Sequence, residues 1–208
     1  MGLIIRCYIM NMLPYMLIAL PILIVIRVWI CAVRKRQGLK PNMFHELGVV
    51  VFVLFLTGLV SQTLISPGGL MAGGLGIFTN PLKRINLVPF QSVIIIRRIF
   101  LNGGYPDDQI IQFLGNIGMF TVPGFMLPVL WGKFEKLKQT VLTCFFISLA
   151  IEVAQLFTGR STDIDDLLLN TLGGLLGFLL YAALKKTIKS DLLGEFKSGK
   201  ENKDDLLP

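Results

Sequence analysis

The segment "IEVAQLFTGRSTDIDDLLLNTLGG", Ile151 to Gly174, joins two apolar runs through a short polar stretch. It holds one glutamate, one arginine, three aspartates and an asparagine. Of the 208 residues in the chain, 53% are hydrophobic and only 16% are charged, which is outside the usual range of a soluble domain. Because ionisable groups are costly inside a bilayer, the segment predicts two membrane helices and a polar site near their junction.

Five apolar runs are long enough to cross a bilayer core, which needs about 20 mostly apolar residues. They are Met10–Val33, Leu47–Ile65, Ile110–Trp131, Gln139–Phe157 and Ile164–Leu184. We therefore predict an all-α, polytopic membrane helical bundle with about five transmembrane helices and a long outer loop between the second and third. The predicted parts are an N-terminal helix with a basic cytoplasmic loop (1–46), a membrane domain (47–184) and a polar cytoplasmic tail that we expect to be disordered (185–208).

The lysines and arginines predict the orientation in the membrane. With the N-terminus outside, thirteen of the 20 basic residues fall in cytoplasmic segments, six fall outside the cell, and Arg27 lies within the first helix. Basic residues near helix ends are retained in the cytoplasm, so we predict a multi-pass cell-membrane protein with the N-terminus out and the C-terminus in. This distribution and attraction to anionic lipid account for the net charge of +7, and we expect no nucleic-acid partner.

The cysteines and the single histidine predict no metal centre of their own. Cys7, Cys31 and Cys144 lie in or beside apolar runs without C-x-x-C spacing, so neither a zinc site nor a disulfide framework is indicated. His45 stands at the predicted cytoplasmic start of the second helix, where capping or an interfacial position is the expected role.

The long connection, Ser66 to Gln109, has two halves of different composition. The first, "SPGGLMAGGLGIFTNP", is rich in glycine and proline and predicts irregular backbone. The second, "INLVPFQSVIIIRRIF", is apolar and ends near Arg97 and Arg98, which is typical of a short amphipathic or re-entrant element at the outer interface. Irregular backbone at membrane depth must be buried or line a wet cavity, so we expect this loop to cover a pocket.

Polar residues on three predicted helices are expected at one depth. Glu152 lies about five residues inside the fourth run, or ~8 Å from its end at 1.5 Å per residue, with Gln155 one turn above it. The fifth helix is expected to begin near Thr162, with Asp163, Asp166 and Asn170 at positions i, i+3 and i+7 on one face. Asn116 falls at a similar depth in the third run.

Structural roles compete with a functional site for these residues. Ser161 or Thr162 can cap the fifth helix, and first-turn carboxylates such as Asp163 and Asp165 complement its dipole. An ion pair between Glu152 and Arg160 is a second alternative. Neither accounts for all the polar groups, so we favour a site. Gly173 and Gly177 have the small-x-x-x-small spacing that lets a neighbouring helix approach closely.

Three segments carry a resemblance to a known family. They are "INLVPFQS" (Ile85–Ser92), "LGNIGMFTVPGFMLP" (Leu114–Pro128) and "IEVAQLFTGRSTDIDDLLLNTLGGLLG" (Ile151–Gly177). Over roughly Leu47 to Leu184 the chain resembles the VanZ-like membrane proteins. One departure, Thr121 and Val122 in place of a more aliphatic stretch, disturbs no polar position. By position, the polar signature of the family falls on Asn86, Asn116, Glu152, Gln155, Arg160, Asp163, Asp166 and Asn170.

The resemblance implies a polytopic protein of the bacterial envelope. Some members of the family are linked to reduced susceptibility to teicoplanin and related lipoglycopeptides. The family is also similar to a wider group of membrane proteins proposed to act on lipid head groups. The partners expected on this basis are membrane lipids or lipid-linked envelope precursors.

Three functional hypotheses follow. In an enzyme, Glu152 or Asp166 would be the general base, Arg160 would hold a phosphate, and Asn116 and Asn170 would orient the head group. A divalent metal, magnesium or calcium, is possible between the carboxylates and a phosphate. In a binding protein, the same pocket would hold a lipid head group or an antibiotic acyl chain without turnover. A transporter ranks third because the inner halves of the helices offer few polar residues.

Overall fold

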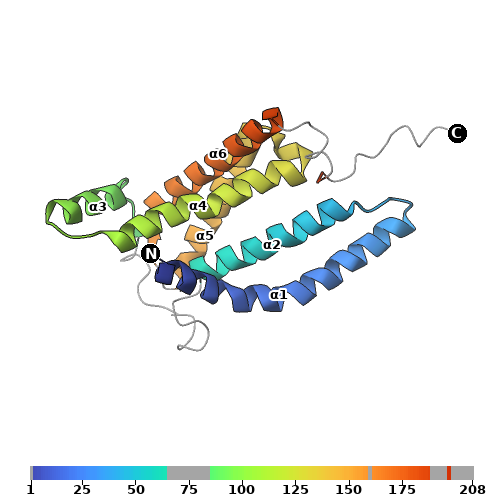
Figure 1. Cartoon of the computed structure of the whole chain (residues 1–208), viewed down its shortest axis with the longest axis horizontal. Helices are drawn as coiled ribbons and strands as arrows, with labels where there is room; N and C mark the ends of the chain where they lie inside the picture. Colours follow the sequence, from blue (N-terminus) through green and yellow to red (C-terminus); the bar gives the residue numbers. More distant parts are fainter. Residues whose placement is uncertain (1, 65–84, 159–160, 188–195, 198–208) are drawn as a thin grey trace.

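The computed structural model describes residues 2–64, 85–158, 161–187 and 196–197 (Figure 1). Six α-helices occupy most of these ranges, with a short 3-10 helix, η3 (Gly132–Glu135), and two strands, β1 (Ile85–Asn86) and β2 (Thr162–Asp163). The α-helices are α1 (Gly2–Arg36), α2 (Met43–Leu64), α3 (Gln91–Leu101), α4 (Asp107–Leu130), α5 (Leu137–Thr158) and α6 (Ile164–Thr187). All except α3 are long and apolar enough to cross a membrane, which confirms the predicted all-α polytopic bundle.

The observed helices extend beyond the predicted apolar runs by a few residues at most ends. α2 begins at Met43, α4 begins at Asp107 and α5 begins at Leu137, each before the first residue of its run. Backbone N–H and C=O groups near a bilayer need internal partners, so a helix gains from continuing through its polar flanks into the interface. The apolar run therefore locates each span, and hydrogen bonding sets its ends.

Glycines set the packing of α4 against α6, which run side by side in the same direction (Figure 1). A Cβ atom added to Gly173 would overlap the backbone carbonyl of Ile117, and one added to Gly177 would overlap that of Thr121. The prediction that Gly173 and Gly177 allow a close helix approach is confirmed. Because the two backbones touch, the register of α6 along α4 is fixed.

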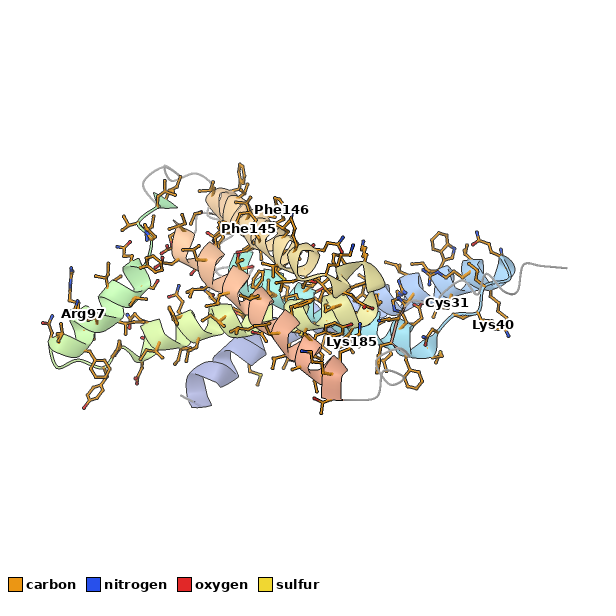
Figure 2. All side chains as sticks on the ribbon, turned by 90° about the horizontal axis from the view of Figure 1, so that it is seen from above. Cys31, Lys40, Arg97, Phe145, Phe146 and Lys185 are labelled. Carbon is orange, nitrogen blue, oxygen red and sulfur yellow. The ribbon has the colours of Figure 1, made fainter. Side chains whose placement is uncertain are left out.

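The two ends of the bundle differ in charge. α1, α4 and α6 start at one end, and α2 and α5 finish there (Figure 1). At the opposite end lie the basic residues that finish α1 and α6. Figure 2 shows Arg97 at the first end and Lys40 at the second. The structure thus separates Glu152 and the start of α6 from the main basic clusters by the length of the bundle.

The basic end contains a cluster of buried and half-buried polar contacts. Arg27 Nε of α1 donates a hydrogen bond of 2.6 Å to Glu46 Oε2 of α2. Asn42 Oδ1 accepts the backbone N–H of Phe44 at 3.0 Å, so Asn42 caps α2. His45, expected to have a capping or interfacial role, lies in the first turn of α2, where it is buried and its Nδ1–H donates to the carbonyl oxygen of Phe196 at 3.0 Å.

The part of the tail that the structure describes also contacts this end. Asn42 Nδ2 donates to the carbonyl oxygen of Lys197 at 3.1 Å, and the rings of Phe44 and Phe196 pack edge to face. Glu135 of η3 pairs with Lys185 and Lys197. Hydrogen bonds from Lys185, which has the larger effect, and from Lys197 lower the pKa of the Glu135 carboxyl below its ordinary value.

A candidate functional site at one end of the bundle

A two-stranded parallel pairing brings the predicted loop onto the α5–α6 junction. Ile85 lies opposite Thr162, and Asn86 lies opposite Asp163. Asn86 Nδ2 donates a hydrogen bond of 3.0 Å to Asp163 Oδ2, which ties the strands through their side chains as well. The segment that begins at Ile85 therefore lies against the start of α6.

Glu152 holds β2 from inside a membrane-spanning helix. The residue is only 4% exposed, and its Oε2 accepts the backbone N–H of Asp163 at 3.0 Å. The Thr162 hydroxyl donates to the backbone carbonyl of Glu152 at 3.1 Å. A buried carboxylate needs hydrogen-bond donors, and here part of that requirement is met by the chain that turns back from α5.

The start of α6 lies within two residues of the prediction. The helix begins at Ile164, because Thr162 and Asp163 are extended in β2. The cap is provided by Asp163 and not by Ser161 or Thr162: Asp163 Oδ1 accepts the Asp165 N–H at 2.9 Å, while the Thr162 hydroxyl donates to the backbone carbonyl of Glu152. Asp163 therefore caps α6 and also bonds to Asn86 of β1 while its own backbone forms part of β2. A residue with a capping role alone would not make the contact with β1.

Asp165 binds a different helix from the one predicted. Its side chain is buried, its Oδ1 accepts the N–H of Phe90 at 2.6 Å, and its Oδ2 accepts the N–H of Ser92 at 2.7 Å. Asp165 thus caps the N-terminus of α3, where unpaired N–H groups and the helix dipole favour an anion. No local sequence pattern indicates this contact, because the partners lie 75 and 73 residues away.

Asn116 and Asp166 connect α4 with α6. Asn116 Nδ2 donates a hydrogen bond of 2.5 Å to Asp166 Oδ1. The glycine contacts deeper in the same helix pair set the register that makes this bond possible. The structure therefore brings five of the predicted residues to one end of the bundle: Asn86, Asn116, Glu152, Asp163 and Asp166.

Gln155 and Asn170 are buried, but among the described residues their hydrogen bonds are made with α2 and α5 and not with the other predicted site residues. Gln155 Nε2 donates to the backbone carbonyl of Thr63 in α2 at 3.1 Å. Asn170 Nδ2 donates to Ser148 Oγ of α5 at 2.9 Å, one turn inward from Asp166. Within the described ranges, the Gln155 Oε1 and Asn170 Oδ1 atoms have no hydrogen-bond partner. Ser148 was not predicted, since an isolated serine in an apolar run gives no signal.

Arg160, the predicted phosphate-binding residue, lies outside the described residues. Across residues 2–64, 85–158, 161–187 and 196–197, no group of three or more His, Cys, Asp or Glu side chains is arranged to hold a metal ion. The described residues therefore lend no support to a divalent metal, which stays a hypothesis.

The described contacts place several carboxylates next to neutral donors. Among the described residues, amides of the backbone or of asparagine donate to Glu152, Asp163, Asp165 and Asp166. Such donors position a carboxylate while leaving it able to accept a proton or a further hydrogen bond. An end of this kind is suited to proton transfer or to holding a polar head group.

Comparison with known proteins places these residues in a family. No curated protein and no solved structure matches the chain. The VanZ/LLP1 family model matches residues 44–185, which contain β1, β2 and every residue predicted for the site. Most of α1 precedes the matched region. The chain therefore belongs to the VanZ/LLP1 family.

Proposed function

We propose that this protein is an enzyme of the bacterial envelope that acts on the head group of a lipid or a lipid-linked precursor. The observation that carries the proposal is Glu152, a buried carboxylate in a membrane-spanning helix, held beside Asp163 at the end of the bundle where Asp166 also lies. An ionisable group at such a position is expensive, and a role in function is the usual reason for keeping it.

In this proposal, Glu152 accepts a proton from a hydroxyl group or a water molecule at the head group, with Asp166 as the alternative base. Asn116 is a positioning residue, because its amide fixes Asp166. Asn86 and Asp163 hold the segment that begins at Ile85 against the start of α6, and Arg160 would bind a phosphate. Gln155 and Asn170 would present their side-chain oxygens to donors of the ligand.

The proposed orientation puts this site at the outer leaflet. The basic ends of α1 and α6 lie at the opposite end of the bundle, where cytoplasmic retention of positive charge would place them inside the cell. The N-terminus would then be outside and the C-terminus cytoplasmic. Substrates would be those exposed on the outer face, including precursors on which teicoplanin-type antibiotics act.

A second candidate is binding without turnover. It is favoured by the hydrogen bonds that Asp163 and Asp166 already make to Asn86 and Asn116, which give a rigid polar surface for a head group or an antibiotic acyl chain. A binding protein needs this shape and the amides but no proton acceptor.

Substitution of Glu152 by glutamine separates the two candidates. Glutamine keeps the shape and an acceptor oxygen but does not accept a proton at neutral pH. We expect Glu152→Gln to abolish the change in envelope lipids that the wild-type protein causes, with normal amounts of protein in the membrane. The measurement is lipid profiling of cells with the wild-type, the variant or no protein.

The matched control is Glu135→Gln, the same chemical change at the opposite end of the bundle, which should leave the lipid profile as in the wild type. If Glu152→Gln also retains the wild-type profile, Glu152 is not the base. If antibiotic tolerance depends on the protein while all lipid classes stay unchanged, binding is the better account.

A further inference from the structure

Helix α3 presents a face of mixed apolar and cationic character at the site end of the bundle. None of its residues is buried. Ile94, Arg97, Arg98 and Leu101 follow the spacing i, i+3, i+4 and i+7, so their side chains share one face. All four are exposed, Leu101 by 73%. The half-buried Ser92, Ile96 and Ile99 lie on the other side, toward the bundle.

The two arginines have no carboxylate partner among the residues that the structure describes. Figure 2 shows Arg97 pointing away from the bundle. Exposed apolar residues continue from this face onto Leu87, Val88 and Phe90, before the helix begins. The surface is thus too apolar for bulk water and too cationic for the centre of a bilayer.

Helix α3 is also firmly attached. Asp165 accepts one short hydrogen bond from the N–H of Ser92 in the first turn and one from the N–H of Phe90 just before the helix. Phe90 has a left-handed backbone with φ of 62°. Such a backbone is unfavourable for a bulky residue, so the hydrogen bond to Asp165 maintains a specific entry into the helix. An element held in this way is positioned for a contact outside the bundle.

We propose that α3 binds the surface of an anionic phospholipid bilayer. Ile94 and Leu101 insert at the level of the glycerol groups, and the guanidinium groups of Arg97 and Arg98 contact lipid phosphates. The methylene stems of arginine lie along apolar surface while the charged ends reach polar groups, which suits this mixed face. The proposal does not depend on whether the site at Glu152 is catalytic.

A lipid surface fits this face better than a protein partner does. Burial of Ile94 and Leu101 in a dry protein interface would desolvate Arg97 and Arg98 between them, which is costly without paired carboxylates. The head-group layer is apolar on one side and rich in phosphate and water on the other. It accommodates both kinds of side chain without that cost.

The attachment through Asp165 gives this contact a consequence for the site. Asp165 lies between Asp163 and Asp166 in sequence, and α3 reaches the same stretch of chain. Lipid bound along α3 is therefore held next to the candidate site. Anionic phospholipid would be enriched at the point where a head group enters.

The test uses the full chain with a fluorescent label on a cysteine at Ile94 and without its native cysteines. The protein is placed in bilayer nanodiscs of equal parts phosphatidylglycerol and phosphatidylcholine, with bromine atoms on the acyl chains of one lipid at a time. We expect brominated phosphatidylglycerol to quench the label more strongly. Each arginine near an anionic surface contributes about 1 kcal/mol, which corresponds to roughly fivefold enrichment.

The double variant Arg97→Gln/Arg98→Gln should remove the preference while leaving quenching by both lipids. The matched control, Lys136→Gln/Lys138→Gln, makes the same change in charge at the opposite end and should retain the preference. Inorganic phosphate added to pure phosphatidylcholine nanodiscs should have no effect. The proposal is overturned if neither brominated lipid quenches the label, or if the wild type and the arginine variant show equal preference.

Discussion

Glu152, Asp163 and Asp165 are close in sequence or space, yet each satisfies a different part of the structure. Glu152 holds the backbone of β2, Asp163 holds Asn86 and the start of α6, and Asp165 holds the start of α3. Neutral amides donate to each of the three carboxylates, and such bonds to a charged acceptor are stronger than bonds between neutral groups. Substitution of each residue should therefore impair a different part of the structure.

Loss of Asp165 should release α3 without changing the rest of the site. In Asp165→Ala, the N–H groups of Phe90 and Ser92 lose their acceptor, at about 1–3 kcal/mol for bonds to a charged group. We expect faster hydrogen exchange in the peptide that spans residues 85–101, measured by mass spectrometry. Asp108→Ala, an exposed aspartate in the first turn of α4, should leave that exchange unchanged. Equal protection in Asp165→Ala and the wild type would contradict the role given to Asp165.

Glu152 and Asp166 should behave as one unit if the site is catalytic. Either Glu152→Gln or Asp166→Asn should abolish the lipid phenotype, and the double variant should be no worse than a single one. Groups that serve one reaction step show such non-additive losses. The measurement is lipid profiling at matched protein levels in the membrane. Partial losses that add in the double variant would indicate two independent structural contributions.

At the scale of whole elements, the α4–α6 contact determines where the polar residues meet. The backbones touch at Gly173 and Gly177, because no side chain intervenes. Close contact also brings the two helix starts together, so that Asn116 reaches Asp166. The glycines deep in the pair and the polar residues at its end therefore depend on each other.

Gly177→Ala should destabilise the bundle through this contact. A methyl group there would overlap the carbonyl of Thr121, and overpacking of this kind costs about 1–3 kcal/mol. The expected result is a lower midpoint in thermal unfolding of the purified protein in detergent. Gly118→Ala is the matched control, since a Cβ at Gly118 meets nothing within 4 Å. Equal midpoints for the two variants would show that α4 and α6 do not pack as described.

At the scale of the whole molecule, the orientation in the membrane decides which leaflet the site serves. We expect a cysteine at Ser161 to react with an impermeant thiol reagent in intact cells, and one at Gln37 to react only after permeabilisation. The reason is the basic end of α1, which favours the cytoplasm. Both variants would lack Cys7, Cys31 and Cys144. Labelling of the Gln37 variant in intact cells would show that the orientation is the reverse of the proposed one and that the site lies at the inner leaflet.

The contact between Glu135 and Lys197 should depend on pH. Hydrogen bonds from Lys185, the larger effect, and from Lys197 lower the Glu135 pKa from its ordinary value of 4.5. The contact therefore stabilises the fold above pH 4.5, and this stabilisation is lost as the pH falls through the lowered pKa. We expect the peptide containing Phe196 and Lys197 to exchange hydrogen faster in acid, after correction for the intrinsic rate. Glu135→Gln should show fast exchange at neutral pH as well. Slow exchange of this variant at neutral pH would contradict the prediction.

The sequence by itself determined the five membrane spans, because a bilayer requires long apolar runs and these are visible without any knowledge of packing. It also identified Gly173 and Gly177 as a contact surface, since small residues at this spacing let the backbone of a neighbouring helix approach closely. The polar residues near the α5–α6 junction were recognised because placing them in an apolar environment is costly.

Only the tertiary structure decided how those polar residues pair. Asp165 serves α3 instead of its own helix, and Gln155 and Asn170 bond to Thr63 and Ser148 instead of to the Glu152 cluster. Depth along a helix follows from the 1.5 Å rise per residue, so it can be read from sequence spacing. Hydrogen bonds act over about 3 Å, and their partners come from segments far apart in the chain. Which donor meets which acceptor therefore depends on the strand pairing at Ile85–Asn86 and on the packing of α4, α5 and α6.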